Sequence, residues 1–261
     1  SDLSIEELKL PQVLKDISKH QNGIILVTGA TGSGKSTTVA SMLDYINQNF
    51  TKNIISFEEP IEYLHRDKKC IINQKEIPDD VKDYKTALKY VLRQDPDIIF
   101  LGELRDQGTI EAAIKASETG HLVISTLHTI NASKSISRIL DFFPPEKSKS
   151  LRFQLAENIR AIVSQRLLKT LEGGKRVVAE VLINTGTMQE LISTEEGMRR
   201  IPEIVKKSEQ LGMQSFDSET LKLYRAGIID FDTAYDASTV KTEIEMARAG
   251  ITSGTDNLIH G

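Results

Sequence analysis

Residues 23–36 of the chain read GIILVTGATGSGKS, an apolar run that passes directly into a glycine-rich loop. A continuous apolar run of this length is typical of a strand that is buried on both faces of a parallel sheet. The loop, Gly29–Ser36, fits the pattern G-x-x-x-x-G-K-[ST] at every fixed position. We therefore predict a strand, a phosphate-binding loop and the start of a helix in direct succession.

Each fixed residue of this loop has a physical role in holding a nucleotide. Glycines let the backbone curl so that successive N–H groups face phosphate oxygens, and the following helix N-terminus adds partial positive charge. Lys35 would reach the β- and γ-phosphates, and the Ser36 hydroxyl would coordinate Mg²⁺. The predicted nucleotide-binding residues are Gly29, Ala30, Thr31, Gly32, Ser33, Gly34, Lys35, Ser36 and Thr37.

The segments that follow the loop alternate between helical and extended patterns. This alternation indicates a mostly parallel sheet covered by helices, which is an α/β fold. The predicted elements, in chain order, are a helix at Lys35–Asn49, a strand at Asn53–Phe57, a helix at Tyr84–Arg93, a strand at Ile98–Leu101, a helix at Thr109–Glu118 and a strand at Leu122–Thr126.

The pattern changes in the second half of the chain. Apolar residues at helical spacing predict one long helix at Ser148–Lys169, followed by a turn at residues 173–174 and a strand at Val177–Ile183. Beyond Thr185 we expect only short amphipathic helices. These patterns divide the chain into an entry helix or linker at 1–22, a core at 23–183, a C-terminal helical subdomain at 184–240 and a tail at 241–261.

Composition narrows the functional classes. The 261 residues carry a net charge of −4, so there is no overall basic character of the kind that coats nucleic acid. The longest apolar runs, such as Ile98–Leu101, are too short to span a bilayer, and no signal peptide is visible. Cys70 is the single cysteine, which excludes an internal disulfide and a cysteine zinc cluster. A cytosolic location fits this cysteine usage.

Two acidic segments follow predicted strands, where open α/β sheets place their ligands. Glu58 and Glu59 end one strand, and Pro60 then turns the chain and carries Glu62 with it. Glu103 ends the next strand and is predicted to hold Mg²⁺, directly or through water, or to orient the attacking water. The residue before it is glycine where an aspartate is usual, so we expect fewer direct carboxylate contacts to the metal.

A third strand end carries hydroxyl and imidazole groups. The segment Thr119–Thr129 contains a strand that should end beside the γ-phosphate. Thr126, His128 and Thr129 are therefore candidates for sensing that phosphate. A histidine at a strand end also commonly has a purely structural role.

Taken together, these segments resemble one family, the secretion ATPases of type II secretion and type IV pilus systems. The family signature joins a Walker A loop, an aspartate box, a Walker B segment ending in Gly-Glu and a histidine box. They are matched, in order, by Gly29–Ser36, Ile54–Tyr63, Leu92–Asp106 and Thr119–Thr129. The likeness spans roughly Leu10 to Ala237 and includes the segments Phe143–Pro144, Leu155–Ala156, Ser164–Leu168 and Gly212–Asp217.

The resemblance implies roles for individual residues and a RecA-like P-loop NTPase core that uses ATP or ADP with Mg²⁺. Glu62 would be the general base for water, and Glu103 the Walker B carboxylate. His128 and, less directly, His121 would link the γ-phosphate to subunit motion. Arg105 would belong to the arginine–aspartate pair that closes the Walker B segment.

The resemblance also implies an assembly. The family works as a homo-hexameric ring on the cytoplasmic face of the inner membrane, where it drives a membrane-embedded pilus platform protein. A PAS-like N-terminal domain that supplies arginine fingers precedes the ATPase core, and Leu10 corresponds to the linker between the two. We therefore expect this chain by itself to be a weak Mg²⁺-dependent ATPase.

Within the family, the pattern is most similar to the retraction ATPases of twitching motility. Assembly and secretion ATPases commonly carry a four-cysteine zinc insertion, which a chain with only Cys70 does not form. Two departures stand against this assignment. Glu59 replaces the usual aspartate of the aspartate box, and Thr185–Glu195 keeps only the apolar skeleton of a motif associated with retraction.

Alternative functions remain open at this point. A pilus-assembly or type II secretion ATPase would have the same core. A nucleic-acid translocase on a RecA-like core is opposed by the acidic balance and by the lack of a visible basic or aromatic stripe. A nucleotide-binding scaffold without turnover is opposed by the presence of both Glu62 and Glu103.

Overall fold

The structure, a computed structural model, describes residues 3–250. Its strands are β1 (Gly23–Gly29), β2 (Asn53–Glu58), β3 (Ile71–Glu76), β4 (Ile98–Leu101), β5 (Leu122–Leu127), β6 (Ile159–Lys169) and β7 (Lys175–Ile183). Its α-helices are α1 (Val13–Ile17), α2 (Lys35–Asn49), α3 (Tyr84–Val91), α4 (Gln107–Glu118), α5 (Ala132–Asp141), α6 (Ser148–Asn158), α7 (Gly186–Ile192), α8 (Glu195–Lys207), α9 (Phe216–Arg225), α10 (Phe231–Ala237) and α11 (Lys241–Arg248).

The strands form one sheet in the order β3-β2-β4-β5-β1-β6-β7. All neighbouring pairs are parallel except β6 and β7, which form an antiparallel hairpin. Strand β1 lies between β5 and β6 and is buried along its whole length, as its apolar sequence predicts. The predicted α/β fold with a mostly parallel sheet is confirmed.

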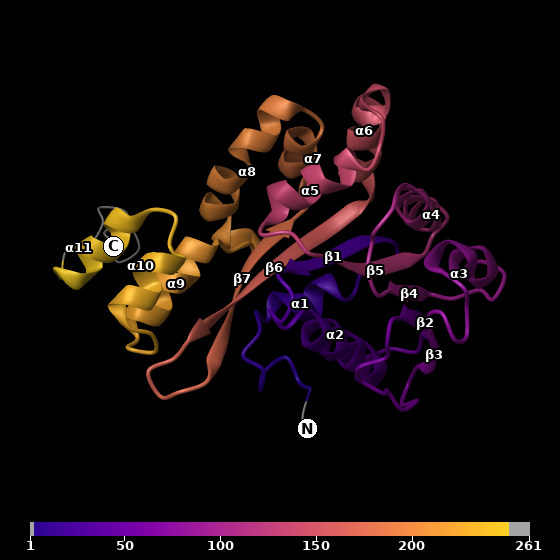
Figure 1. Cartoon of the computed structure of the whole chain (residues 1–261), viewed down its shortest axis with the longest axis horizontal. Coiled ribbons are helices and arrows are strands. Elements are labelled where there is room, and N and C mark those ends of the chain that lie inside the picture. Colours follow the sequence, from indigo (N-terminus) through magenta and orange to yellow (C-terminus); the bar gives the residue numbers. More distant parts are fainter. Residues whose placement is uncertain (1–2, 251–261) are drawn as a thin grey trace.

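Alternate residues of β1 enter two different cores. Ile24 and Leu26 face the core that α3 to α8 cover, whereas Ile25 and Val27 face the core that α1 and α2 cover. Figure 1 shows these two layers, with α1 and α2 on one side of the sheet and α5 to α8 on the other. A strand packed on both faces explains why the sequence of β1 is apolar without alternation.

The C-terminal helices belong to two packing groups. Helices α7 and α8 join the main core of the sheet, whereas α9, α10 and α11 form a separate cluster with Leu168 and Val178 of the β6–β7 hairpin. In Figure 1 these three helices gather beyond β7. The tail predicted at 241–261 begins with a helix, α11, whose residue Ile244 packs in this cluster. The rest of that segment, 251–261, lies outside the described residues.

The long helix predicted at Ser148–Lys169 is wrong in its second half. Helix α6 ends at Asn158, and Ile159 begins strand β6. The Asn158 amide donates to Gln154 O over 2.8 Å and accepts from Ser117 Oγ over 2.7 Å, which fixes the helix end. Strand β6 is buried on both faces, so apolar residues follow one another along it and also fit the spacing of a helix. The sequence pattern therefore allows either a helix or a strand, and pairing with β1 selects the strand.

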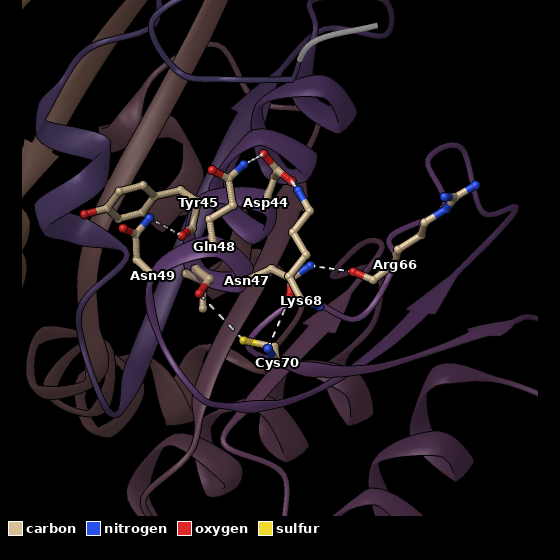
Figure 2. Close-up of polar contacts among 9 residues, drawn as sticks. Asp44, Tyr45, Asn47, Gln48, Asn49, Arg66, Lys68 and Cys70 are labelled. Carbon is tan, nitrogen blue, oxygen red and sulfur yellow. Dashed lines mark hydrogen bonds and ion pairs between the residues drawn. The ribbon is translucent and has the colours of Figure 1, made fainter.

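A buried asparagine ties the helix after the phosphate loop to the segment that leads into β3. Asn47 of α2 donates to Arg66 O over 2.7 Å. Its Oδ1 atom accepts from the backbone N–H groups of Lys68, over 3.0 Å, and Cys70, over 3.2 Å. Figure 2 shows these contacts beside Asn49, which points outward and bonds only to its own helix. Asn47 thereby fixes the loop between β2 and β3 against α2.

Replacing Asn47 by alanine should destabilise the protein by about 2 kcal/mol, because three backbone groups lose their partner in a partly buried site. Asn49→Ala is the matched control on the same helix. Its side chain is exposed, so the expected change is less than about 0.5 kcal/mol. Urea unfolding of both variants measures the difference, and equal free energies of unfolding would show that the Asn47 contacts contribute nothing.

Candidate active site

The phosphate loop connects the carboxyl end of β1 to the N-terminus of α2. Gly32 and Gly34 have φ angles of 81° and 92°, in the left-handed region that favours glycine, and Gly34 is the residue that caps α2. At Gly29 a Cβ atom would overlap the Ser33 side chain and the backbone of Gln165. Three of the glycines in the motif are therefore required by backbone conformation or by close packing.

Lys35 lies buried within the loop and contacts two other parts of the site. Its Nζ atom donates to Gly29 O over 2.6 Å and to His128 Nδ1 over 2.7 Å. Because an ammonium group can only donate, Nδ1 must accept, and the imidazole proton is then on Nε2. That atom lies 3.2 Å from Glu103 Oε1, so a continuous chain of polar contacts joins Lys35, His128 and Glu103.

Burial at this position disfavours the charged form of Lys35. Burial lowers the pKa of Lys35 below its usual range, and the nearby Glu103 carboxylate opposes that effect in part. An anionic ligand in the loop would supply the countercharge that the ammonium group lacks. The electrostatics of the loop therefore favour phosphate binding.

The remaining predicted residues come to the same edge of the sheet because parallel strands present their carboxyl ends together. Glu58 ends β2, Glu103 follows β4, and His128 follows β5. A cavity of about 90 Å³ opens between Glu58, Glu103 and α2. Its polar lining is formed by Ser36, Glu58, Glu59, Glu62, Tyr63, His65, Tyr84, Glu103, Arg105 and Thr126.

Glu58 and Glu59 have different partners although they are adjacent in sequence. Glu58 Oε2 accepts from Ser56 Oγ over 2.8 Å and from Gln74 Nε2 over 3.1 Å. Burial raises the pKa of the Glu58 carboxyl, against these two hydrogen bonds. Glu59 instead turns to Arg105, whose guanidinium lies 2.9 Å from Glu59 Oε2. The longer side chain at position 59 is therefore used in an ion pair.

Arg105 joins the aspartate box to the Walker B segment. The same NH2 atom that contacts Glu59 lies 3.4 Å from Glu103 Oε2, and the guanidinium stacks 5.0 Å from the Tyr84 ring centroid. Burial raises the pKa of Tyr84 to about 12, so its hydroxyl stays protonated. A Cβ atom at Gly102 would overlap that hydroxyl, which explains why glycine precedes Glu103. Sequence reasoning missed Tyr84, since a tyrosine at a helix start carries no local signal.

Glu62 is exposed on the wall of the cavity. Its neighbour Tyr63 holds the loop in place, because the Tyr63 hydroxyl lies 2.8 Å from Thr37 Oγ1 and Tyr63 O accepts from Gln74 Nε2 over 2.8 Å. The predicted nucleotide-binding residue Thr37 is thus tied to the loop that carries Glu62. Sequence reasoning missed Tyr63, although its position directly after Glu62 was a signal.

His121 is not part of this cluster. It precedes β5 at the amino end of the strand, and its Nδ1 atom contacts Ala116 O over 2.9 Å. Strand β5 separates His121 from His128 by about 20 Å at about 3.3 Å per residue. Thr126 bonds to Gly102 O, and Thr129 Oγ1 lies 2.5 Å from Ser135 Oγ, so both hydroxyls are engaged within the protein.

Ser36 and Glu103 carry donor atoms of the kind that a magnesium ion prefers. Both line the same cavity and offer hard oxygen donors. Within residues 3–250 there is no cluster of three histidine, cysteine or acidic residues able to hold a metal by itself.

None of the helices within residues 3–250 combines the length and the apolar character needed to cross a membrane.

A glycine loop at the end of a central strand, with its lysine bound to groups from two neighbouring strand ends, defines a P-loop nucleotide-binding protein. The profile of the type II/IV secretion system protein family matches residues 1–234, and the chain belongs to that family. The resemblance found in the sequence is confirmed.

Individual relatives agree with this assignment. The chain is 40% identical over 257 residues to the type IV pilus ATPase PilU of Pseudomonas aeruginosa, covering 98% of this chain and 67% of PilU. It is 41% identical over 238 residues to the pilus retraction ATPase PilT of the same organism, covering 91% and 69%. A crystal structure of the pilus retraction motor PilT with bound ADP superposes with a TM-score of 0.86 at 42% identity, covering 93% and 68%. The chain thus spans about two thirds of the length of these relatives.

The titration of Glu58 gives a test of the site's electrostatics. Because burial raises the folded-state pKa of Glu58, its protonated form contributes stability below the ordinary value of 4.5, and this is lost as pH rises through the folded pKa. The free energy of unfolding of the wild type, minus that of Glu58→Gln, should therefore fall as pH rises from about 4 to about 8. A difference that is constant with pH would contradict the raised pKa.

Proposed function

We propose that this chain is the ATP-hydrolysing engine of a type IV pilus motor and that it powers pilus retraction. The observation that carries the proposal is the contact chain from Lys35 through His128 to Glu103, at the mouth of a phosphate loop. These are the groups that must respond to a γ-phosphate, and they come from three different strand ends. Family membership and the similarity to PilT and PilU support the choice of motor.

Binding of ATP would begin with an exchange of partners at Lys35. The phosphates compete with Gly29 O and His128 for the ammonium group, which is held by those two contacts in this structure. Two phosphate oxygens are stronger acceptors than a carbonyl and a neutral imidazole, because the hydrogen bonds become charge-assisted on both sides. His128 is then released to face the γ-phosphate, so its orientation reports whether that phosphate is present.

Hydrolysis requires a base for the attacking water. Glu62 stands on the cavity wall, where its carboxylate takes a proton as the water oxygen bonds to the γ-phosphorus. The bond to the β–γ bridging oxygen breaks, and ADP and phosphate are formed. Lys35 stabilises the negative charge of the transition state. Mg²⁺, held by Ser36 and Glu103 when bound, supplies further charge neutralisation.

The motor would be a homo-hexameric ring. Glu59, Glu62 and Arg105 lie at the exposed mouth of the cavity, where a neighbouring domain could complete the site. We propose that a PAS-like domain preceding this chain contributes arginine fingers there. The ring would act on the cytoplasmic face of the inner membrane and pass its motion to the platform protein of the pilus machine.

Glu62→Gln tests the catalytic assignment. ATP hydrolysis by the full-length protein should fall at least about 100-fold, because the general base is lost. ADP affinity should stay within about threefold, since the hydrogen bonds of Lys35 Nζ and Ser33 O in the described part of the chain do not involve Glu62. Glu172→Gln, in the exposed turn of the β6–β7 hairpin, is the control and should leave both quantities unchanged. Near-normal hydrolysis in Glu62→Gln would remove this residue from the mechanism.

The direction of the motor is tested in cells. Loss of a retraction ATPase leaves pili that extend but do not withdraw, so deletion of the gene should give over-piliated cells without twitching motility. An assembly or secretion ATPase would instead leave cells bald or unable to secrete. Electron microscopy of surface pili distinguishes the outcomes. Cells without pili would favour an assembly ATPase, although the single cysteine of this chain argues against that assignment.

A further inference from the structure

Strand β6 runs directly beside the phosphate loop and places one polar side chain beneath it. Gln165 of β6 pairs with Gly29, the first residue of the loop. Its side chain is 2% exposed, and its Nε2 atom donates to Ser33 O over 3.2 Å. Gln165 is the second residue of the segment Ser164–Leu168, which the catalytic steps above do not use.

The orientation of the Gln165 amide follows from its partner. Ser33 O is an acceptor, so the nitrogen must face it, and the amide oxygen points elsewhere. Among the residues that the structure describes, Gln165 Oε1 and Ser33 Oγ are buried without a hydrogen-bond partner. Buried polar atoms are nearly always satisfied, so retaining an amide here, in place of an apolar side chain, has a cost in stability. A benefit elsewhere must offset it.

The benefit that Gln165 offers is control over the direction in which the carbonyl groups of the phosphate loop point. A phosphate loop binds anions only if its N–H groups face the ligand and its C=O groups face away. Gln165 lies under Ser33 and Gly34, where a Cβ added to Gly34 would stand 3.5 Å from Gln165 Nε2. The hydrogen bond from Gln165 Nε2 thus ties the Ser33 carbonyl to strand β6.

We infer that Gln165 is a positioning residue for nucleotide binding, acting through the backbone of the phosphate loop. The inference rests on the proposed function, because it assigns Gln165 to the same nucleotide site. Without the donor, the Ser33 carbonyl is free to rotate toward the phosphates. Its oxygen would then repel them and withdraw the N–H of Gly34 from the cradle.

Gln165→Met tests the inference, because methionine keeps the volume of the side chain and removes the donor. ADP affinity, measured by calorimetry on the folded chain, should fall about tenfold, which corresponds to about 1.4 kcal/mol. Gln214→Met is the matched control. Gln214 Nε2 also donates to a backbone carbonyl, that of Ala179 over 2.8 Å, and it does not contact the loop. The control should keep wild-type affinity for ADP.

Two further measurements separate positioning from simple loss of stability. Hydrogen exchange of residues 29–34 should accelerate in Gln165→Met and not in Gln214→Met. The melting temperature of Gln165→Met should be no lower than that of Gln214→Met, because methionine removes a buried oxygen that has no partner. If Gln165→Met does not fold, Gln165→Asn replaces it. That side chain is one methylene shorter, so the amide no longer reaches Ser33 O but stays polar, and the same loss of affinity is expected.

The possible results are distinct. A wild-type chain that binds neither ADP nor ATP would overturn the proposed function itself. A wild-type chain that binds ADP, with Gln165→Met or Gln165→Asn binding within twofold of it, would overturn the positioning role alone. Equal losses of affinity in Gln165→Met and Gln214→Met would also overturn it, because the effect would then belong to general stability.

Discussion

Parallel hydrogen bonding of β1 to both β5 and β6 is the constraint on which the rest of the site depends. Residues Gly23–Thr28 pair in register with Leu122–Leu127, and Gly29 pairs with Gln165. This register determines where each strand ends along the sheet. As a result the phosphate loop, the loop that begins at His128 and the side chain of Gln165 all lie at the same edge of the sheet. A shift of one residue would turn each side chain to the other face of the sheet.

The electrostatics of the site are built around a buried ammonium group. Lys35 has only a carbonyl and an imidazole as direct partners, and the nearest carboxylate, Glu103, is reached through His128. On the exposed side, Arg105 contacts both Glu59 and Glu103. Glu103 therefore contacts one cation, Arg105, directly and the other, Lys35, only through His128. A phosphate group entering this arrangement changes the partners of several side chains at once, which suits a protein that converts ligand state into motion.

The β6–β7 hairpin links the nucleotide site to the C-terminal helices. Arg166, next to Gln165, stacks 3.8 Å from the Phe216 ring centroid and donates to Ala237 O over 3.3 Å. On the partner strand, Glu180 accepts from Ala132 N, at the start of α5, over 2.9 Å. Burial raises the pKa of Glu180, in part against the effect of the Arg166 charge. One hairpin thus contacts the phosphate loop, the segment after the histidine box and the helices α9 to α10.

The sequence by itself determined the local chemistry of this protein. The loop Gly29–Ser36 needs glycines for its left-handed backbone, and this need is local, so a motif records it. The positions of Glu58, Glu103 and His128 at strand ends were also predictable, because parallel strands share one carboxyl edge.

Only the tertiary structure decided the features that depend on residues far apart in the chain. Residues 159–169 satisfy both helical and extended spacing, and β1 selects the strand. His121 and His128 belong to one motif, yet the length of β5 separates them. Tyr84 and Gln165 reach the site from distant parts of the chain, and only the packing of the sheet and its helices brings them there.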